Sequence, residues 1–198
     1  MKGSAVRVLL IGPPASGKGT QGRRIASTFG VPYLSSGELL RAQVAAGTSL
    51  GERVAADLAA GDLVPDDVML EALRDPLHEA LISGGYVLDG FPRNLAQALH
   101  LTTYATEFGG APEVAVWFDV ADAELMQRTR NRAIAEGRVD DVDAVARHRI
   151  DVYNAATAPL VDHYRELGLL IRVDAARPVD DVTATVLKEL RPFAPDPR

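Results

Sequence analysis

One short motif near the N-terminus limits the possible folds of this chain more than any other part of the sequence. Residues 12–20 read GPPASGKGT, directly after an apolar run at 6–11 and directly before a helical pattern. The Gly-x-x-x-x-Gly-Lys spacing between a strand and a helix is that of a phosphate-binding loop. Small residues let successive backbone N–H groups face one concavity, and the positive end of the next helix also attracts anions. An ordinary glycine-rich turn does not need all three features, so we predict a nucleoside triphosphate site here.

The rest of the chain alternates short apolar runs with longer helical patterns. The expected strands occupy residues 6–11, 33–34, 86–88, 114–120 and 169–173. The expected helices occupy residues 20–29, 38–46, 50–60, 66–82, 95–108, 123–132, 142–167 and 179–190. Apolar runs that are continuous, with no polar residue at every second position, are typical of parallel strands buried on both faces. We therefore predict an α/β fold of the P-loop NTPase type, with three α/β/α layers and a five-stranded parallel sheet.

Two segments depart from this alternation. Residues 36–64 hold two helical patterns with no strand between them, and residues 132–141 are mostly polar and include Gly137. Segments of this kind are often mobile lobes inserted between core elements. We expect one domain over 1–198, with a core of 1–35, 65–131 and 142–198 and two inserted lobes at 36–64 and 132–141.

Composition excludes several classes of function. The 198 residues include 21 basic and 27 acidic side chains, for a net charge of −6, and no cysteine. An acidic chain is poorly suited to nucleic acids or anionic membranes, and the early apolar run is too short to span a bilayer, so we expect a cytoplasmic protein. The lack of cysteine excludes disulfides and thiol catalysis. However, 18 of the basic residues are Arg and 3 are Lys, and Arg suits bidentate recognition of oxyanions.

Four motifs in one order resemble those of the nucleoside monophosphate kinases, above all the short-lid adenylate kinases. They are GKGTQ at 17–21, LSSGELLR at 34–41, DGFPR at 89–93, and the series Arg128, Arg132, GRVDD at 137–141 and Arg149. Together they cover the chain to about residue 180. The resemblance implies that 36–64 is a nucleoside monophosphate-binding lobe and that 132–141 is a short lid. The short lid has no room for a further insertion and no cysteines, and the four histidines are scattered, so we expect no structural zinc.

On the donor side, Lys18 supplies a mobile charge for the outer phosphates and Thr20 a hydroxyl for Mg²⁺. The resemblance implies an ATP site made of Gly12, Ala15, Ser16, Gly17, Lys18, Gly19, Thr20, Arg128 and Arg177. It also implies that Asp89 holds Mg²⁺ or its water, although a capping role for Asp89 is an alternative. Ala15 stands where most relatives have glycine, and it would be strained if this position needs a positive φ.

On the acceptor side, Arg41 and Arg93 come from different elements and could clamp one phosphate together. The resemblance assigns that phosphate to AMP and implies contacts from Ser36, Arg41, Val64, Gly90, Arg93, Gln97, Arg138 and Arg149. It implies catalytic roles for Lys18, Arg93, Arg132, Arg138 and Arg149. A solvated helix charge is the alternative for Arg41, and we assign Arg130 and Arg147 to solvent.

The identity of the acceptor base depends on a few polar side chains. The Gln97 amide can both donate to and accept from the edge of adenine, and Ser36 adds a hydroxyl, whereas Asn94 resembles the pattern of pyrimidine kinases. We predict reversible phosphoryl transfer from MgATP to AMP, giving two ADP, by a monomer. The alternatives are a UMP/CMP kinase of the same fold and a non-catalytic, nucleotide-dependent switch.

Overall fold

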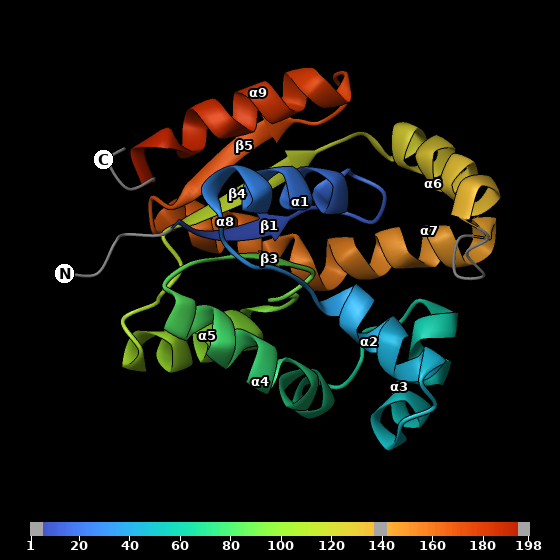
Figure 1. Cartoon of the computed structure of the whole chain (residues 1–198). Coiled ribbons are helices and arrows are strands. Elements are labelled where there is room, and N and C mark those ends of the chain that lie inside the picture. The colour runs from blue at the N-terminus through green and yellow to red at the C-terminus, as the bar shows by residue number, and fades with distance from the viewer. Residues whose placement is uncertain (1–5, 137–141, 194–198) are drawn as a thin grey trace.

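The computed structural model of the chain describes residues 6–136 and 142–193 (Figure 1). The strands are β1 (Arg7–Ile11), β2 (Tyr33–Ser35), β3 (Tyr86–Asp89), β4 (Val114–Asp119) and β5 (Leu170–Asp174). The α-helices are α1 (Lys18–Phe29), α2 (Ser36–Ala45), α3 (Ser49–Ala60), α4 (Asp66–Ser83), α5 (Leu95–Glu107), α6 (Asp122–Glu136), α7 (Asp143–Val152), α8 (Pro159–Glu166) and α9 (Val179–Leu190). A π-helical turn, Tyr153–Thr157, joins α7 to α8, and a 3-10 turn, Arg191–Phe193, follows α9.

The five strands form one parallel sheet in the order β2-β3-β1-β4-β5. Strand β1 lies in the centre, where Leu9 is paired with Leu88 of β3 and with Ala115 of β4. The predicted five-stranded parallel sheet is therefore confirmed.

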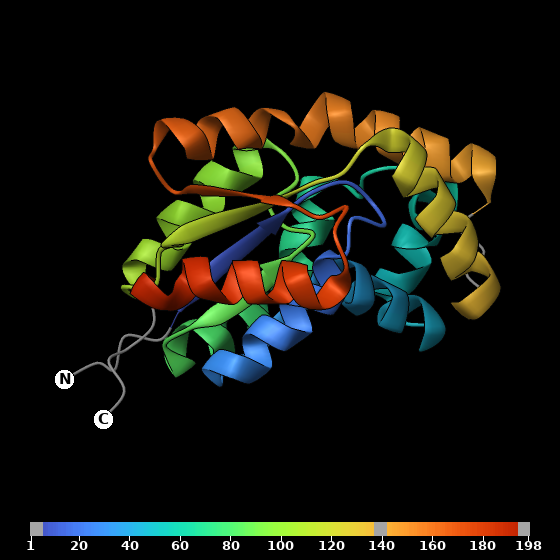
Figure 2. The same cartoon turned by 90° about the horizontal axis from the view of Figure 1, so that it is seen from above.

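Helices cover both faces of the sheet, which explains why the strands are continuously apolar. Leu9 and Ile11 of β1 contribute to a core shared with α4, α5 and α8. Val8 and Leu10 face the opposite way, into a core shared with α1 and α9. Figure 2 shows α9 and the α7–α8 segment on opposite sides of the strands. The side chains from Val8 to Ile11 are thus all buried against one layer or the other.

The prediction of one helix over 142–167 was wrong in detail. The helix is interrupted at the π-helical turn, where the backbone nitrogen of Ala158 bonds the carbonyl of Tyr153 at 2.9 Å. Pro159 follows as the first residue of α8. Proline has no N–H to continue the regular hydrogen-bond series, and π-helical turns of this kind often lie at functional sites.

Helices α2 and α3 follow one another without an intervening strand, as expected. Ser35 caps α2, because its Oγ accepts a hydrogen bond from the backbone nitrogen of Glu38 at 3.4 Å. The chain after α3 contacts α7: His148 Nε2 lies 2.6 Å from Asp62 Oδ1. A side chain at Gly61 would come within 2.6 Å of Arg149 Cγ. The end of this helix pair therefore packs directly against α7.

Among the described residues, no helix is long and apolar enough to cross a membrane.

Candidate active site

A large cavity lies at the carboxyl ends of the strands, where open α/β sheets bind their ligands. Its volume is about 1450 Å³. The walls come from the phosphate loop, the turn after β3, the inner face of α6, the π-helical turn and the segment after β5. A single small-molecule pocket usually measures roughly 300–1,000 Å³, so this cavity has room for more than one ligand.

The phosphate loop connects β1 to α1 and lines this cavity. Gly17 lies just before α1 at φ 96°, in a left-handed conformation. Ala15 has φ 63°, and it is the one non-glycine residue of the described chain with a positive φ. The backbone strain expected for alanine at a position with positive φ is therefore present at Ala15. The loop keeps its shape with alanine, although glycine would adopt it at lower cost.

Lys18 is held inside the loop by backbone carbonyls. Its Nζ donates to the carbonyls of Gly12 and Pro13, both at 2.7 Å, and lies 3.5 Å from Ser16 Oγ. Burial above all, together with Arg93, Arg149 and Arg132, lowers the pKa of Lys18 to about 8, against the opposing effect of Asp89. These arginines therefore lie close enough to act on one ammonium. An anion placed among them would relieve their mutual repulsion.

Asp89 ends β3 and lines the cavity beside the phosphate loop. It is only 8% exposed, and its Oδ2 accepts a hydrogen bond from the Tyr33 hydroxyl at 2.8 Å. Burial and the neighbouring carboxylate raise the pKa of Tyr33, which stays a donor. A side chain at Gly22 would come within 2.4 Å of the Tyr33 ring, so the glycine lets this ring pack on α1. Tyr33 thus orients the Asp89 carboxylate.

The donor set around the loop fits Mg²⁺. Thr20 offers a hydroxyl and Asp89 a carboxylate, and both line the cavity. Mg²⁺ is usually bound by one or two protein oxygens together with phosphates and waters. Among the described residues, no three histidine or acidic side chains gather in a metal-binding group. Asp119, at the end of β4, accepts hydrogen bonds from Arg172.

Arg93 is held from several directions at the turn after β3. Its Nε donates to the carbonyl of Gly90 at 2.7 Å, and its Nη2 lies 3.5 Å from Ser36 Oγ. Its own carbonyl accepts from Thr157 Oγ1 of the π-helical turn at 2.8 Å. Burial lowers the pKa of Arg93, and Arg41 lowers it further, so these two arginines lie near one another as the clamp requires. Both also line the cavity.

Three residues expected at the acceptor site lie behind its wall. Ser36 is fully buried, and its Oγ donates to the carbonyl of Gly90 at 2.7 Å. A side chain at Gly90, where φ is 77°, would come within 2.6 Å of that hydroxyl. Val64 is 2% exposed and belongs to the hydrophobic core. Gln97 is also 2% exposed, and none of these three side chains lines the cavity.

Gln97 and Asn94 have structural partners at the start of α5. Gln97 Oε1 accepts from the backbone nitrogen of Arg93 at 2.7 Å, and its Nε2 donates to Asp66 Oδ1 at 2.6 Å. Asn94 caps α5 by accepting from the backbone nitrogen of Gln97 at 2.8 Å. A helix cap is a sufficient reason for asparagine at position 94, so this residue no longer argues for a pyrimidine acceptor.

Two arginines expected at the ATP site, Arg128 and Arg177, come from α6 and from the segment after β5. Arg128 Nη2 donates to the carbonyl of Ala175 at 2.9 Å, while its Nε bonds Glu124. Arg177 lines the cavity and pairs with Asp181 at 3.1 Å. Arg128 and Arg177, which the resemblance assigns to one ATP site, are thus neighbours in the fold.

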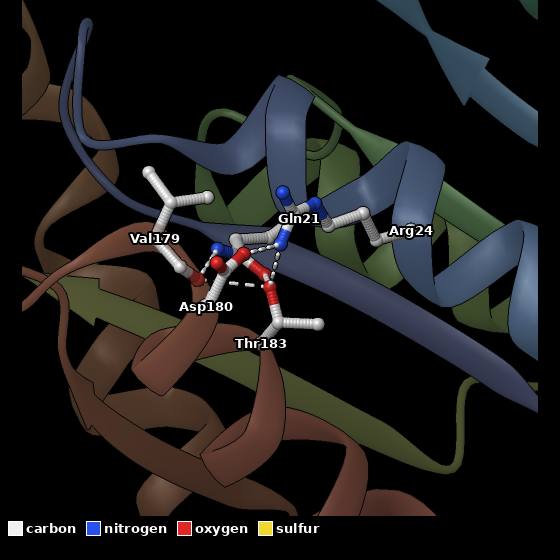
Figure 3. A network of polar contacts seen from close by, with 5 residues as sticks. All are labelled: Gln21, Arg24, Val179, Asp180 and Thr183. Atoms are coloured by element: carbon white, nitrogen blue, oxygen red, sulfur yellow. Dashed lines mark hydrogen bonds and ion pairs between the residues drawn. The ribbon is translucent and has the colours of Figure 1, made fainter.

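A polar network fixes this segment relative to the phosphate loop (Figure 3). Gln21 of α1 donates to the carbonyl of Val179 at 2.9 Å and accepts from Thr183 Oγ1 at 2.8 Å. Arg24 donates to Thr183 and pairs with Asp180 at 2.7 Å. The start of α9 is thereby tied to the helix that carries Lys18.

The arginine-rich region is only partly described. Arg132 and Arg149 line the cavity. Arg138 and the rest of 137–141 lie outside the described residues. Arg130 pairs with Asp143 at 2.8 Å on the surface, in agreement with its assignment to solvent.

Sequence reasoning missed Tyr33, Asp66, Thr157 and Gln21. Each acts through a contact with a residue more than 30 positions away in the chain. No local spacing marks such pairs. Only Gln21 stood inside a recognised motif, at the end of GKGTQ, where its position pointed to the loop.

Comparison with known proteins agrees with this geometry. The family model described as adenylate kinase matches residues 10–169. An adenylate kinase of Xanthomonas oryzae pv. oryzae is 44% identical over 185 residues, covering 93% of this chain and 99% of the relative. An adenylate kinase of Stenotrophomonas maltophilia is 41% identical over 186 residues, covering 94% of this chain and all of the relative. The chain therefore belongs to the adenylate kinase family.

Proposed function

We propose that this protein transfers the terminal phosphoryl group of ATP to AMP and forms two ADP reversibly. The observation that carries the proposal is a second cationic site, Arg41 with Arg93, in the same cavity as the phosphate loop. A protein that binds one nucleotide needs only the loop. Two separate groups of cations facing one cavity are the arrangement that a phosphoryl transfer between two nucleotides requires.

In this proposal ATP lies on the phosphate loop. Backbone N–H groups of 15–19 and the ammonium of Lys18 bind its phosphates, and its base lies near Arg128 and Arg177. The hydrogen bond from Arg128 to Ala175 supports this placement, because it closes one side of the space beside the loop. The network of Gln21 and Thr183 keeps that side in register with the loop.

AMP takes the other half of the cavity, with its phosphate between Arg41 and Arg93. One oxygen of that phosphate attacks the γ-phosphorus of ATP, and the bond from this phosphorus to the bridging oxygen of ADP breaks. The transferred group gains no proton and leaves none behind. Most of the catalysis is thus positioning and charge neutralisation, a role that the arginines acting on Lys18 support, namely Arg93, Arg132 and Arg149.

Thr20 and Asp89 are the residues that would hold Mg²⁺, directly or through water. The metal would neutralise charge on the outer phosphates of ATP. Tyr33 supports this assignment, because its hydrogen bond leaves the second carboxylate oxygen of Asp89 for another partner.

We also propose that 36–64 and 132–141, the latter with Arg138, move over the bound nucleotides as a lobe and a lid and exclude water, which would otherwise accept the phosphoryl group. The protein would act as a cytoplasmic monomer. The curated relatives are named adenylate kinases, so neither the UMP/CMP kinase nor the switch is favoured.

A coupled assay with AMP, CMP and UMP as rival acceptors tests the proposal. We expect AMP to be preferred clearly, and a preference for CMP would contradict the choice of acceptor while leaving the reaction class intact. A dinucleotide joining two adenosines through five phosphates should bind far more tightly than ATP, because it fills both halves of the cavity. Equal affinities would contradict two adjoining sites.

A further inference from the structure

Two neighbours of opposite hydrogen-bonding character fix the orientation of the Gln97 amide. Asp66 Oδ1 lies 2.6 Å from Gln97 Nε2, and the backbone nitrogen of Arg93 lies 2.7 Å from Gln97 Oε1. An ionised carboxylate can only accept a hydrogen bond, and a backbone N–H can only donate one. Turning the amide over would set oxygen against oxygen and N–H against N–H. Only one of the two orientations therefore satisfies both neighbours.

Asp66 is itself held in place by a second amide. Asn94 Nδ2 donates to both of its carboxylate oxygens, at 3.1 and 3.3 Å. Asn94 cannot turn over either, because its oxygen accepts from the backbone nitrogen of Gln97 at 2.8 Å. Asp66 also stands at the first residue of α4, where a helix stabilises negative charge. The starts of α4 and α5 are thus joined by a closed set of hydrogen bonds.

The fixed amide keeps one N–H and one oxygen lone pair for a further partner. On a 6-aminopurine, the exocyclic group donates and the adjacent ring nitrogen accepts. On a 6-oxopurine, the exocyclic oxygen accepts and the ring N–H donates. An amide held in one orientation towards this edge of the base matches the hydrogen-bonding pattern of one kind of purine and opposes that of the other. The direction in which the amide is fixed can therefore select between the two kinds of purine.

We propose that Asp66 is a positioning residue that fixes the Gln97 amide for a 6-aminopurine acceptor and against a 6-oxopurine. The inference rests on the proposed function and on the contact between Gln97 and the base of AMP that the family resemblance implies. Because Gln97 is only 2% exposed, an incoming base must displace the side chains that cover it. Asp66 keeps the Gln97 amide oriented before the base arrives. The entropy of ordering this side chain is therefore lost during folding and not during binding.

The test compares AMP and IMP as acceptors, with ATP as donor, in the wild type and in Asp66→Asn. Asparagine can offer either an oxygen or an NH₂ group to Gln97, so it no longer fixes the amide. We expect the ratio of kcat/KM for AMP to kcat/KM for IMP to fall about tenfold. The fall should arise mainly from KM, with kcat for AMP within about threefold of the wild type.

Matched variants separate positioning from charge and from folding. Asp67→Asn removes the same charge at the same end of α4, from an exposed neighbour, and should leave the ratio unchanged. Asp66→Glu keeps an acceptor-only partner and should restore most of the selectivity. If Asp66→Asn does not fold, as judged by thermal melting, Asp66→Ser offers a second partner that both donates and accepts.

The outcomes distinguish this inference from the proposed function. An unchanged ratio in Asp66→Asn, with a lowered ratio in Gln97→Ala, would show that Gln97 reads the base without help from Asp66 and would overturn the inference. An unchanged ratio in Gln97→Ala would overturn it as well, by removing its premise. Lack of phosphoryl transfer to AMP in the wild type would contradict the proposed function itself.

Discussion

On the donor side of the cavity, the hydrogen-bond partners of Lys18 come from the continuous segment 12–20, whereas the acceptor side around Arg93 draws on elements far apart in the chain. Lys18 bonds carbonyls five and six residues before it. Arg93 depends on Ser36, 57 residues away, and on Thr157, 64 residues away. The donor loop is a local structure that its own sequence specifies. The acceptor turn has its shape only when α2, α5 and the π-helical turn are all in place.

The first way to test this comparison is to remove the central cation from each side. Lys18→Ala should lower kcat/KM for both substrates by about 10³-fold, because Lys18 acts on the transferred phosphoryl group. Arg93→Ala should lower kcat/KM for AMP by about 10²–10³-fold and change the Kd of ATP by less than about threefold. Steady-state kinetics and calorimetric titration of ATP would measure both.

Arg130→Ala is the control for this pair, since Arg130 forms a surface ion pair with Asp143 outside the cavity. It should leave both quantities near the wild-type values. Equal weakening of ATP and AMP by Arg93→Ala would mean that the two cations serve one site. Unchanged activity and unchanged AMP affinity would instead favour the nucleotide switch.

A smaller effect should follow from the pKa of Lys18, which burial and the nearby arginines lower to about 8. Below pH 8 the ammonium is present and binds phosphate, and above pH 8 it is lost from the unliganded protein. The affinity for ATP should therefore fall about fivefold between pH 8 and pH 9. Calorimetry in buffers of different ionisation enthalpy at pH 8.5 should record proton uptake on binding.

The lowered pKa of Lys18 makes the stability of the fold change with pH in the opposite direction from the affinity for ATP. The pKa of Lys18 in the folded protein lies below its ordinary value of 10.5, so the unfolded chain binds more protons between about pH 8 and 10.5. The contribution of Lys18 to the free energy of unfolding should thus rise with pH in this interval. The control for the fall in ATP affinity is Lys18→Arg, because arginine stays charged over this whole pH range. A similar fall in ATP affinity in that variant would contradict the view that deprotonation of Lys18 causes it.

The smallest effect concerns the backbone of the donor loop. Ala15 holds φ 63°, a conformation that costs a non-glycine residue roughly 1–2 kcal/mol. Glycine removes this strain but makes the unfolded chain more flexible, which offsets part of the gain. Ala15→Gly should raise the free energy of unfolding by about 0.5–1 kcal/mol, as measured by urea denaturation. A lower free energy of unfolding would show that the loop carries no such strain.

The same division between local and distant contacts explains what could be predicted from the sequence. The parallel sheet and the phosphate loop followed from apolar runs and from one motif, since both are specified by neighbouring residues. The interruption before Pro159 was missed, because the apolar pattern continues through the π-helical turn. The partners of Gln97 were missed for another reason: Asp66 lies 31 residues earlier, and no periodicity relates two helix starts.

The burial of Ser36, Val64 and Gln97 illustrates the same limit. A motif can identify a residue as part of a site without saying whether its side chain faces the ligand or supports the residue that does. Ser36 supports the Gly90 turn, and Gln97 supports the backbone of Arg93.

The contact between the end of the α2–α3 pair and α7 has a thermodynamic consequence. Asp62 meets His148, and Gly61 packs on Arg149, an arginine that lines the nucleotide cavity. If a nucleotide bound on one side stabilises this contact, the contact must in turn raise the affinity for that nucleotide by an equal factor. Cooperativity between the two substrates is therefore reciprocal: whatever ATP adds to the affinity for AMP, AMP adds to the affinity for ATP.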